Sequence, residues 1–211
     1  MTLECKNVEK YYGAFLALRI ESLLVCEGIW WVKGENGSGK TTFLKMIAGL
    51  HPFLGDIILS DNLTLKRKRQ QYLQRVNYAE AEPLYPTFLT AKDLVELYCT
   101  TKGGLVKDAR DLLEQLHIND AYEKPLGTYS SGMIKKLSIA LAFIGKPQWI
   151  LLDEPLITID ANAVEVVCGM IKERNQQGTS FIITSHQLLQ VNQLAFSGTM
   201  VAANNTISLS Q

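Results

Sequence analysis

The sequence predicts an α/β fold with a mostly parallel sheet, and three observations lead to this prediction. The apolar runs at residues 149–152 and 181–183 have the composition of strands that are buried on both faces. Between them, residues 161–176 show the spacing of an amphipathic helix, which Gly178 closes. A further short β-prone run, residues 29–32, lies far upstream. Strands buried on both faces and separated by helices indicate a parallel sheet.

An antiparallel β segment is expected ahead of this sheet. Residues 3–10 and 15–25 are both strand-like, and the Tyr-Tyr-Gly turn between them predicts a hairpin. Residues 42–50 are expected to form a helix whose apolar face includes Phe43 and Leu50.

The middle of the chain is expected to be helical. Thr90 and Asp93 resemble a capping box, and the apolar residues of 109–116 repeat at helical spacing. A third helix is expected after Gly132, and a terminal hairpin at residues 200–209.

These elements predict one domain over residues 1–211. Its core is expected at about 1–82 and 146–211, with a helical lobe inserted at about 83–145.

Composition excludes several classes of protein. With 47% hydrophobic residues the chain can bury a core, and its 21 basic and 21 acidic residues give no field that recruits nucleic acid. No apolar run approaches the ~20 residues that a membrane span needs, and the N-terminus does not resemble a secretory signal, so a cytoplasmic location is expected. The four cysteines are widely spaced and are expected to be reduced and mostly buried.

The most informative motif is Gly-Glu-Asn-Gly-Ser-Gly-Lys-Thr-Thr at residues 34–42, a G-x-x-x-x-G-K-[ST] phosphate-binding loop. A β-prone run precedes it and a helical pattern follows it, which favours this function over a glycine-rich turn that binds nothing. Lys40 can reach the β and γ phosphates, and the Thr41 hydroxyl suits Mg²⁺. The residues predicted to bind ATP here are Gly34, Asn36, Gly37, Ser38, Gly39, Lys40, Thr41 and Thr42.

Two carboxylates follow the apolar strand at residues 149–152. Asp153 and Glu154 lie at the carboxyl end of this strand, the edge at which open α/β sheets bind ligands. Asp153 suits Mg²⁺ through its water shell, and Glu154 suits the polarisation of an attacking water. The alternative is two solvated acids at a turn, but the phosphate loop argues against it.

Together these motifs resemble the nucleotide-binding subunit of ATP-binding cassette (ABC) ATPases, over nearly the whole chain. Residues 34–42 match the Walker A loop and residues 150–154 the Walker B strand with its catalytic Glu. Tyr-Ser-Ser-Gly-Met at 129–133 matches the signature motif, usually Leu-Ser-Gly-Gly-Gln. Residues 159–160 match the end of the D-loop, and His186 the switch histidine. The resemblance implies a P-loop NTPase (RecA-like) core, an N-terminal antiparallel β subdomain and an inserted α-helical lobe.

The resemblance also implies how such a site works. Ser130 and Gly132 would complete the ATP site of a second subunit in a head-to-tail homo- or heterodimer. Tyr12 takes the position of the aromatic residue that stacks on adenine, with Tyr11 as the alternative. His186 is expected to sense the γ-phosphate.

Two loops depart from the family pattern. Ala81 stands where the Q-loop normally has glutamine, and either Glu80 or Glu82 is a candidate to replace it. In the D-loop, Ile157-Thr158 replaces a serine and a small residue. The basic run at residues 66–69 is interpreted as a solvated loop, with contact to lipid headgroups or a partner as the alternative.

The expected function is that of a Mg²⁺-dependent ATPase subunit, peripheral on the cytoplasmic face of the membrane, that drives a separately encoded membrane-spanning permease. The signature motif and the Leu-Tyr-Pro at 84–86 resemble ABC-2-type exporter ATPases. The alternatives are a soluble ABC ATPase outside transport and an ATP-gated regulatory subunit that hydrolyses slowly.

Overall fold

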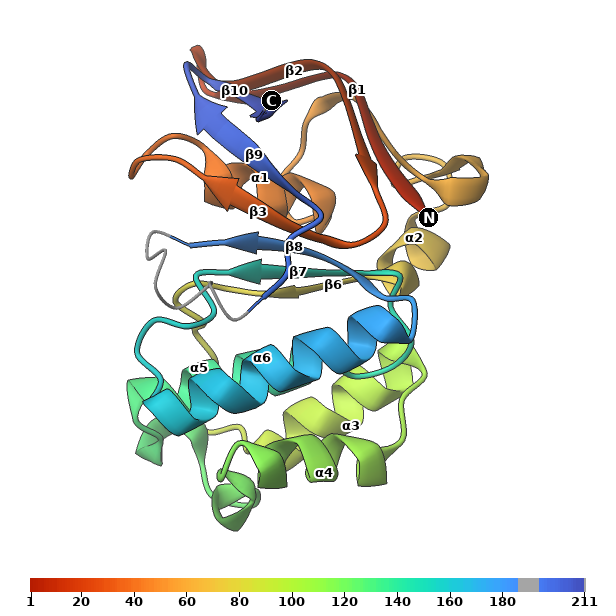
Figure 1. The fold of residues 1–211 in the computed structure, drawn as a ribbon. Coiled ribbons are helices and arrows are strands. Elements are labelled where there is room, and N and C mark those ends of the chain that lie inside the picture. Colours follow the sequence, from red (N-terminus) through yellow and green to blue (C-terminus); the bar gives the residue numbers. More distant parts are fainter. Residues whose placement is uncertain (186–193, 211) are drawn as a thin grey trace.

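The computed structural model describes residues 1–185 and 194–210. Within these ranges the chain forms two sheets and a layer of helices (Figure 1). The smaller sheet has the strand order β2-β1-β4-β5, and the larger has the order β10-β9-β3-β8-β7-β6. Both follow the prediction of an α/β core with an N-terminal antiparallel segment.

The smaller sheet is built on a long hairpin. Strands β1 (Thr2–Tyr12) and β2 (Phe15–Cys26) pair antiparallel along most of their length, as predicted. Their apolar residues alternate with exposed polar ones, so one face of the hairpin is buried. Strands β4 (Leu54–Leu59) and β5 (Leu63–Thr64) complete this sheet.

The larger sheet is mostly parallel. Strands β3 (Ile29–Lys33), β8 (Ser180–Thr184), β7 (Trp149–Asp153) and β6 (Val76–Ala79) run parallel in that spatial order. Every residue of β7 and β8 is buried, which is why their sequences read as continuous apolar runs.

A terminal hairpin extends the same sheet. Strand β9 (Gly198–Ala203) pairs parallel with β3, and β10 (Thr206–Leu209) pairs antiparallel with β9. Asn204 and Asn205 both have positive φ, as the predicted two-residue turn requires.

The two faces of the larger sheet bury two different cores. Trp149 and Leu151 pack toward helix α1 (Lys40–Ile47), which lies between the two sheets in Figure 1. Ile150 and Leu152 point to the other face, where α5 (Ser131–Ala142) and α6 (Ala161–Gln176) cover the sheet. Because side chains alternate along β7, this one buried strand packs against the phosphate-loop helix on one face and against the helical layer on the other.

The helical stretch contains the three helices that the pattern predicts. Helix α3 (Ala91–Lys102) begins with a capping box between Thr90 and Asp93, as expected, and α4 (Val106–Gln115) packs beside it. Helix α5 begins at Ser131 rather than after Gly132, because Ser130 caps it.

The predicted C-terminal end of the first helix is wrong. Helix α1 ends at Ile47 because Ala48 caps it and Gly49 adopts a left-handed conformation. Leu50 therefore lies outside the helix, and 56% of its surface is exposed instead of packed on an apolar face.

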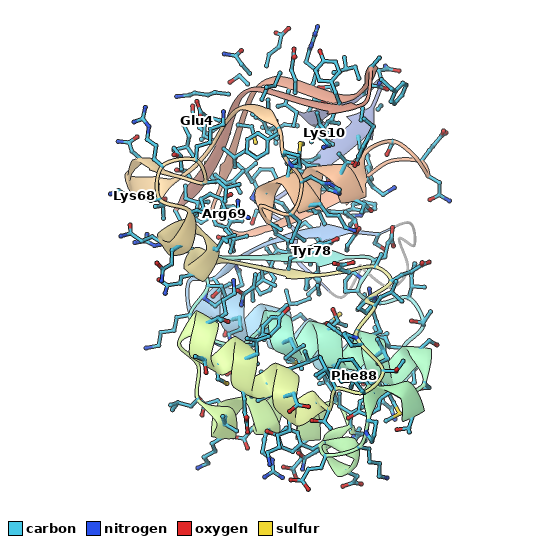
Figure 2. The ribbon with its side chains drawn as sticks, turned by 180° about the vertical axis from the view of Figure 1, so that it is seen from behind. Glu4, Lys10, Lys68, Arg69, Tyr78 and Phe88 are labelled. Atoms are coloured by element: carbon cyan, nitrogen blue, oxygen red, sulfur yellow. The ribbon has the colours of Figure 1, made fainter. Side chains whose placement is uncertain are left out.

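Several short elements were not predicted, among them two strands and one helix. Strands β4 and β5 and helix α2 (Arg69–Arg75) lie between the two predicted regions. Their few apolar residues do not show a clear period, and α2 buries only Tyr72. The basic run at 66–69 thus leads into α2, and Figure 2 shows Lys68 and Arg69 at the start of this helix.

Side chains from both layers hydrogen-bond to the opposite backbone where the helical stretch meets the sheet. Lys102, at the end of α3, donates through Nζ to the carbonyls of Leu73 and Val76. In the other direction, Asn77 Nδ2 donates to the carbonyls of Ala142 (2.8 Å) and Ile144 (2.9 Å). Strand β6 is therefore tied to α3 and α5 by polar bonds as well as by packing.

Lys102→Met should change the pH dependence of stability. Burial lowers the pKa of Lys102 from 10.5 to about 8, so between these values Lys102 binds more protons in the unfolded chain than in the native one. Its contribution to the stability of the native state therefore rises with pH in this window. We expect the stability of the wild type relative to the variant to rise through this window. The rise should be well below the about 3 kcal/mol of the full shift, because the side chain is only half-buried.

Urea unfolding of both proteins, followed by circular dichroism near neutral pH and near the upper end of the window, measures this difference. The comparison cancels the contributions of buried tyrosines and cysteines, which both proteins share. A difference that is constant with pH would show that burial does not disfavour the charged form of Lys102.

Candidate nucleotide-binding site

The predicted phosphate loop connects β3 to α1 and is held close to its surroundings. Gly37 and Gly39 have φ of 78° and 99°, a left-handed conformation that suits glycine. A Cβ added at Gly34 would lie 2.5 Å from the Ala202 carbonyl and 2.6 Å from Ser38 Oγ. The backbone therefore passes between the helix start and β9 with no room for a side chain.

Lys40 lies within this loop. Its side chain is 6% exposed, and Nζ donates to the carbonyls of Gly34 (2.8 Å) and Glu35 (2.9 Å). Burial lowers the pKa of Lys40, while the nearby carboxylates of Glu154 and Asp153 raise it. The ammonium group thus marks the place where the loop would hold an anion.

Ser38 supplies a second indication that the loop fits a ligand. Its Oγ is buried and has no hydrogen-bond partner among the residues that the structure describes. A buried hydroxyl without a partner is costly, and a phosphate oxygen would accept its hydrogen bond. The exposed Thr41 hydroxyl lies at the same helix N-terminus, which favours negative charge.

The carboxylate of Asp153 is fixed by two hydroxyl groups. Only 1% of the residue is exposed; Thr184 Oγ1 donates to Oδ1 at 2.7 Å, and the Tyr78 hydroxyl donates to Oδ2 at 3.2 Å. Burial raises the pKa of Tyr78, so its hydroxyl stays protonated as a donor. The amide of Glu154 donates to the same Thr184 Oγ1 at 2.9 Å. The end of β8 therefore positions both acidic residues.

The turn after β7 contains two residues with an uncommon backbone conformation. Glu154 has φ of 46° and Thr158 has φ of 69°, which is strained for a β-branched residue. Such strain persists only where the surrounding structure enforces it, and it is concentrated at functional sites.

One cavity of about 470 Å³ brings most of the predicted site together. It is lined by Asn36, Gly37, Ser38, Gly39, Lys40, Thr41, Thr42, Ala81, Glu82, Glu154, Ile157 and Thr158. This cavity therefore brings the phosphate loop together with the predicted catalytic Glu. It also contains the Q-loop and D-loop residues that differ from the family pattern. A triphosphate held by the loop would place its terminal phosphate toward Glu154.

The site suits a magnesium ion that arrives with a nucleotide. No group of three or more His, Cys, Asp and Glu side chains within residues 1–185 and 194–210 could hold a metal alone. Magnesium does not need such a group, because it is usually held by one or two carboxylates, water and substrate phosphates. Asp153 and the Thr41 hydroxyl are protein ligands of the kind that this arrangement uses.

Tyr12 lies beside the phosphate-loop helix. Its hydroxyl is 3.4 Å from Thr42 Oγ1, its ring meets His51 edge-on at 5.9 Å, and Lys10 Nζ lies 4.7 Å from its ring centre. Tyr11 instead donates to Glu9. The position of Tyr12 favours it over Tyr11 as the adenine-stacking residue, which stays a prediction.

The signature residues do not line this cavity. Ser130 caps α5, its Oγ accepting from the Met133 amide at 3.2 Å, and a Cβ added at Gly132 would lie 2.9 Å from the Thr158 carbonyl. His186, the predicted γ-phosphate sensor, lies outside the described residues.

The segment after β6 is held through its backbone rather than through a glutamine. Lys135 Nζ donates to the carbonyls of Glu80 (2.6 Å) and Ala81 (2.9 Å) and also to that of Asp153 (2.8 Å). The Glu80 carboxylate lies 3.6 Å from Lys45, whereas Glu82 lines the cavity. Of the two candidates to replace the glutamine, Glu82 is therefore the one that lines the cavity of the phosphate loop.

Sequence reasoning missed Tyr78, Lys135 and Thr184. Thr184 ends a buried strand next to β7, a signal that could have been used, since carboxyl ends of neighbouring parallel strands converge. Nothing in the sequence distinguishes Lys135 from an exposed helical lysine.

Comparisons with known proteins concern the chain as a whole. A family model described as ABC transporter matches residues 22–157. The chain is 28% identical over 197 residues to the linearmycin resistance ATP-binding protein of Bacillus subtilis (strain 168), covering 91% of this chain and 63% of that protein. It is 27% identical over 194 residues to a lantibiotic transport ATP-binding protein of Streptococcus pyogenes, covering 92% and 83%. The chain thus spans less than two thirds of the first relative.

A solved structure of an ATP-binding subunit of an ABC transporter superimposes with a TM-score of 0.89 at 22% identity. The superposition covers 100% of this chain and 90% of that one. At this identity the likeness shows the fold, which confirms the predicted architecture.

Lys40→Met should weaken nucleotide binding by at least about tenfold, because charge-assisted hydrogen bonds contribute roughly 1.5–3 kcal/mol. Equilibrium titration with a fluorescent ATP analogue measures the dissociation constant. Lys45→Met is the matched control: it removes a lysine from the same helix that contacts the Glu80 carboxylate instead of the loop. An equal loss in both variants would contradict a specific role of Lys40.

Proposed function

This chain belongs to the ABC transporter family, and we propose that it binds and hydrolyses ATP to power export through a separately encoded membrane-spanning partner. In this proposal residues 1–211 act as one ATPase domain. Its core comprises about residues 1–82 and 146–211, and the lobe about 83–145. The linearmycin resistance and lantibiotic transport names of two relatives support export.

The observation that carries the proposal is the shared cavity of the phosphate loop and Glu154. Backbone amides of residues 34–42 and the Lys40 ammonium would bind the phosphates. Thr41 and Asp153 would hold Mg²⁺, which when bound neutralises charge that develops on the transferred phosphoryl group. Glu154 would accept a proton from the attacking water, and His186 would contact the γ-phosphate.

The position of the signature motif supports a dimer. Ser130 and Gly132 open helix α5 outside the cavity, so this helix N-terminus is not used by the chain's own phosphate loop. We propose that it faces the ATP of a second ABC subunit in a head-to-tail arrangement. A two-fold interface of this kind would close when nucleotide is bound and open after hydrolysis.

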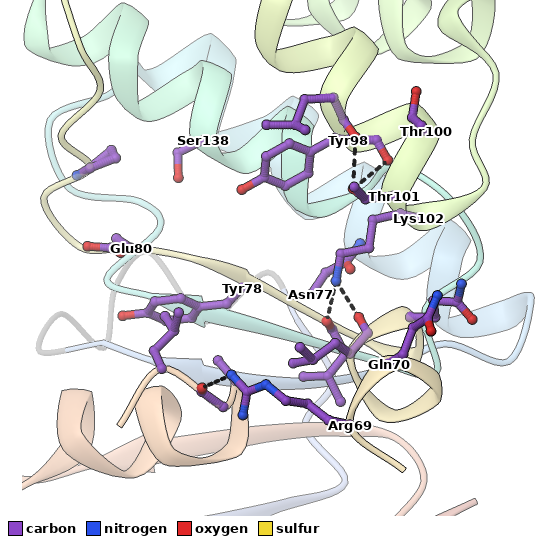
Figure 3. A pocket seen from close by; sticks show the side chains of 18 of the residues that line it. Arg69, Gln70, Asn77, Tyr78, Glu80, Tyr98, Thr100, Thr101, Lys102 and Ser138 are labelled. Carbon is purple, nitrogen blue, oxygen red and sulfur yellow. Dashed lines mark hydrogen bonds between the residues drawn. The ribbon is translucent and has the colours of Figure 1, made fainter. Parts of the chain in front are cut away.

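The partner contact is proposed at a groove between α3 and the sheet. The groove has a volume of about 700 Å³ and is lined partly by Leu50, Tyr78, Leu84 and Leu97 (Figure 3). Leu84 is 92% exposed, and contiguous exposed apolar surface is typical of interaction sites. We propose that a segment of the membrane-spanning subunit fills it.

The membrane association is therefore indirect in this proposal. Within the described ranges no helix combines the length and the apolar character that a bilayer crossing requires. The chain would lie on the cytoplasmic face through its partner.

Glu154→Gln should lower steady-state ATP turnover by about a hundredfold or more, the usual contribution of a general base, and should trap an ATP-bound dimer. Phosphate release measures the first effect, and size-exclusion chromatography in Mg-ATP measures the second. Glu165→Gln, an exposed acid on α6, is the matched control and should behave as wild type.

Three outcomes separate the proposals. A wild type that binds ATP without turnover would favour the regulatory subunit. Turnover without a membrane-spanning protein in detergent extracts of the native membranes would favour an ABC ATPase outside transport. Turnover that survives Glu154→Gln would remove the role of Glu154.

A further inference from the structure

Tyr78 lies between the groove proposed for the membrane-spanning partner and the acidic residue proposed to hold magnesium. Its side chain lines the groove between α3 and the sheet, which Tyr98 and Glu80 also line (Figure 3). Its hydroxyl lies at the other end of the side chain and donates to Asp153 Oδ2 at 3.2 Å. In Figure 2 Tyr78 lies on the sheet between α1 and the helical layer.

The position of Tyr78 follows from strand register. Tyr78 pairs with Leu151 in the parallel β6–β7 ladder, so its side chain lies on the same face of the sheet as that of Leu151. Asp153 lies two residues further along β7, again on that face. A tyrosine is long enough to span this offset, so the hydroxyl meets the carboxylate rather than solvent.

The Asp153 carboxylate then has one hydroxyl donor on each oxygen. Thr184 donates to Oδ1 and Tyr78 to Oδ2, from the two strands that flank β7. A carboxylate held on both oxygens cannot rotate freely about its terminal torsion. Each oxygen keeps a lone pair for water, as a magnesium site with one protein carboxylate requires.

We propose that Tyr78 is a positioning residue for magnesium: its hydroxyl holds the Asp153 carboxylate in the orientation that accepts the hydrated ion of Mg-ATP. The inference rests on the proposed function, because it needs Asp153 to serve the metal. It adds a residue outside the nucleotide cavity, supplied by the edge strand. Loss of hydrogen bonds that orient metal-binding groups weakens metal affinity even when the ligand itself is retained.

A purely structural role gives a different expectation. If the hydroxyl only satisfied its own hydrogen-bonding need, Tyr78→Phe would change stability but not the metal dependence. If the groove as a whole affected the site, Tyr98→Phe would act in the same way, because Tyr98 lines the same groove from helix α3.

The test compares wild type, Tyr78→Phe and Tyr98→Phe. Electron paramagnetic resonance measures the binding of Mn²⁺, as a stand-in for Mg²⁺, in the presence of a non-hydrolysable ATP analogue. Fluorescent-nucleotide titration in EDTA measures metal-free affinity. The Mg²⁺ concentration for half-maximal turnover is a third readout, and thermal melting confirms that each variant is folded.

For Tyr78→Phe we expect metal binding to weaken about threefold to tenfold, the range that one lost hydrogen bond gives. Metal-free nucleotide affinity should stay unchanged, and Tyr98→Phe should match wild type. Wild-type metal binding in Tyr78→Phe, or an equal loss in Tyr98→Phe, overturns the inference and leaves the proposed function standing. A wild type that binds no metal with its nucleotide overturns both.

Discussion

The three hydrogen bonds of the Lys135 ammonium are the constraint on which the arrangement of the site depends. Lys135 is 2% exposed, and it joins α5 to the carbonyls after β6 and to the carbonyl of Asp153. A buried ammonium group is costly unless its protons are all bonded, and burial lowers its pKa to about 8. The helical layer, the edge of the sheet and the acidic turn are therefore held in register by one cation.

The same region keeps the acidic turn in a strained conformation. Glu154 and Thr158 both have positive φ, and Pro155 and Leu156 between them are buried. The buried residues anchor the turn, while Thr184 holds the Glu154 amide from the neighbouring strand. A backbone fixed in this way presents the Glu154 side chain from a constant position, which is an advantage of a preorganised site.

Much of this organisation was predictable from the sequence. The remaining features were not predictable, and the reason is physical. Strands β7 and β8 are recognisable in the sequence because both of their faces are buried, which gives continuous apolar runs. The phosphate loop is recognisable because phosphate binding needs a fixed spacing of glycine and lysine. Helix α2 is short and buries one side chain, so it leaves no period to detect. Tyr78 and Lys135 act through contacts between strands and helices distant in sequence, and these exist only after the chain has folded.

The close approach of Gly132 to the Thr158 carbonyl has a consequence for how this protein can diverge. The signature loop and the D-loop touch with no space for a methyl group, since a Cβ at residue 132 would lie 2.9 Å from that oxygen. Thr158 already occupies a backbone region that β-branched residues avoid, so it has little freedom to retreat. A lineage that replaced this glycine would first have to acquire a more permissive residue at 158, which makes the order of the two substitutions matter.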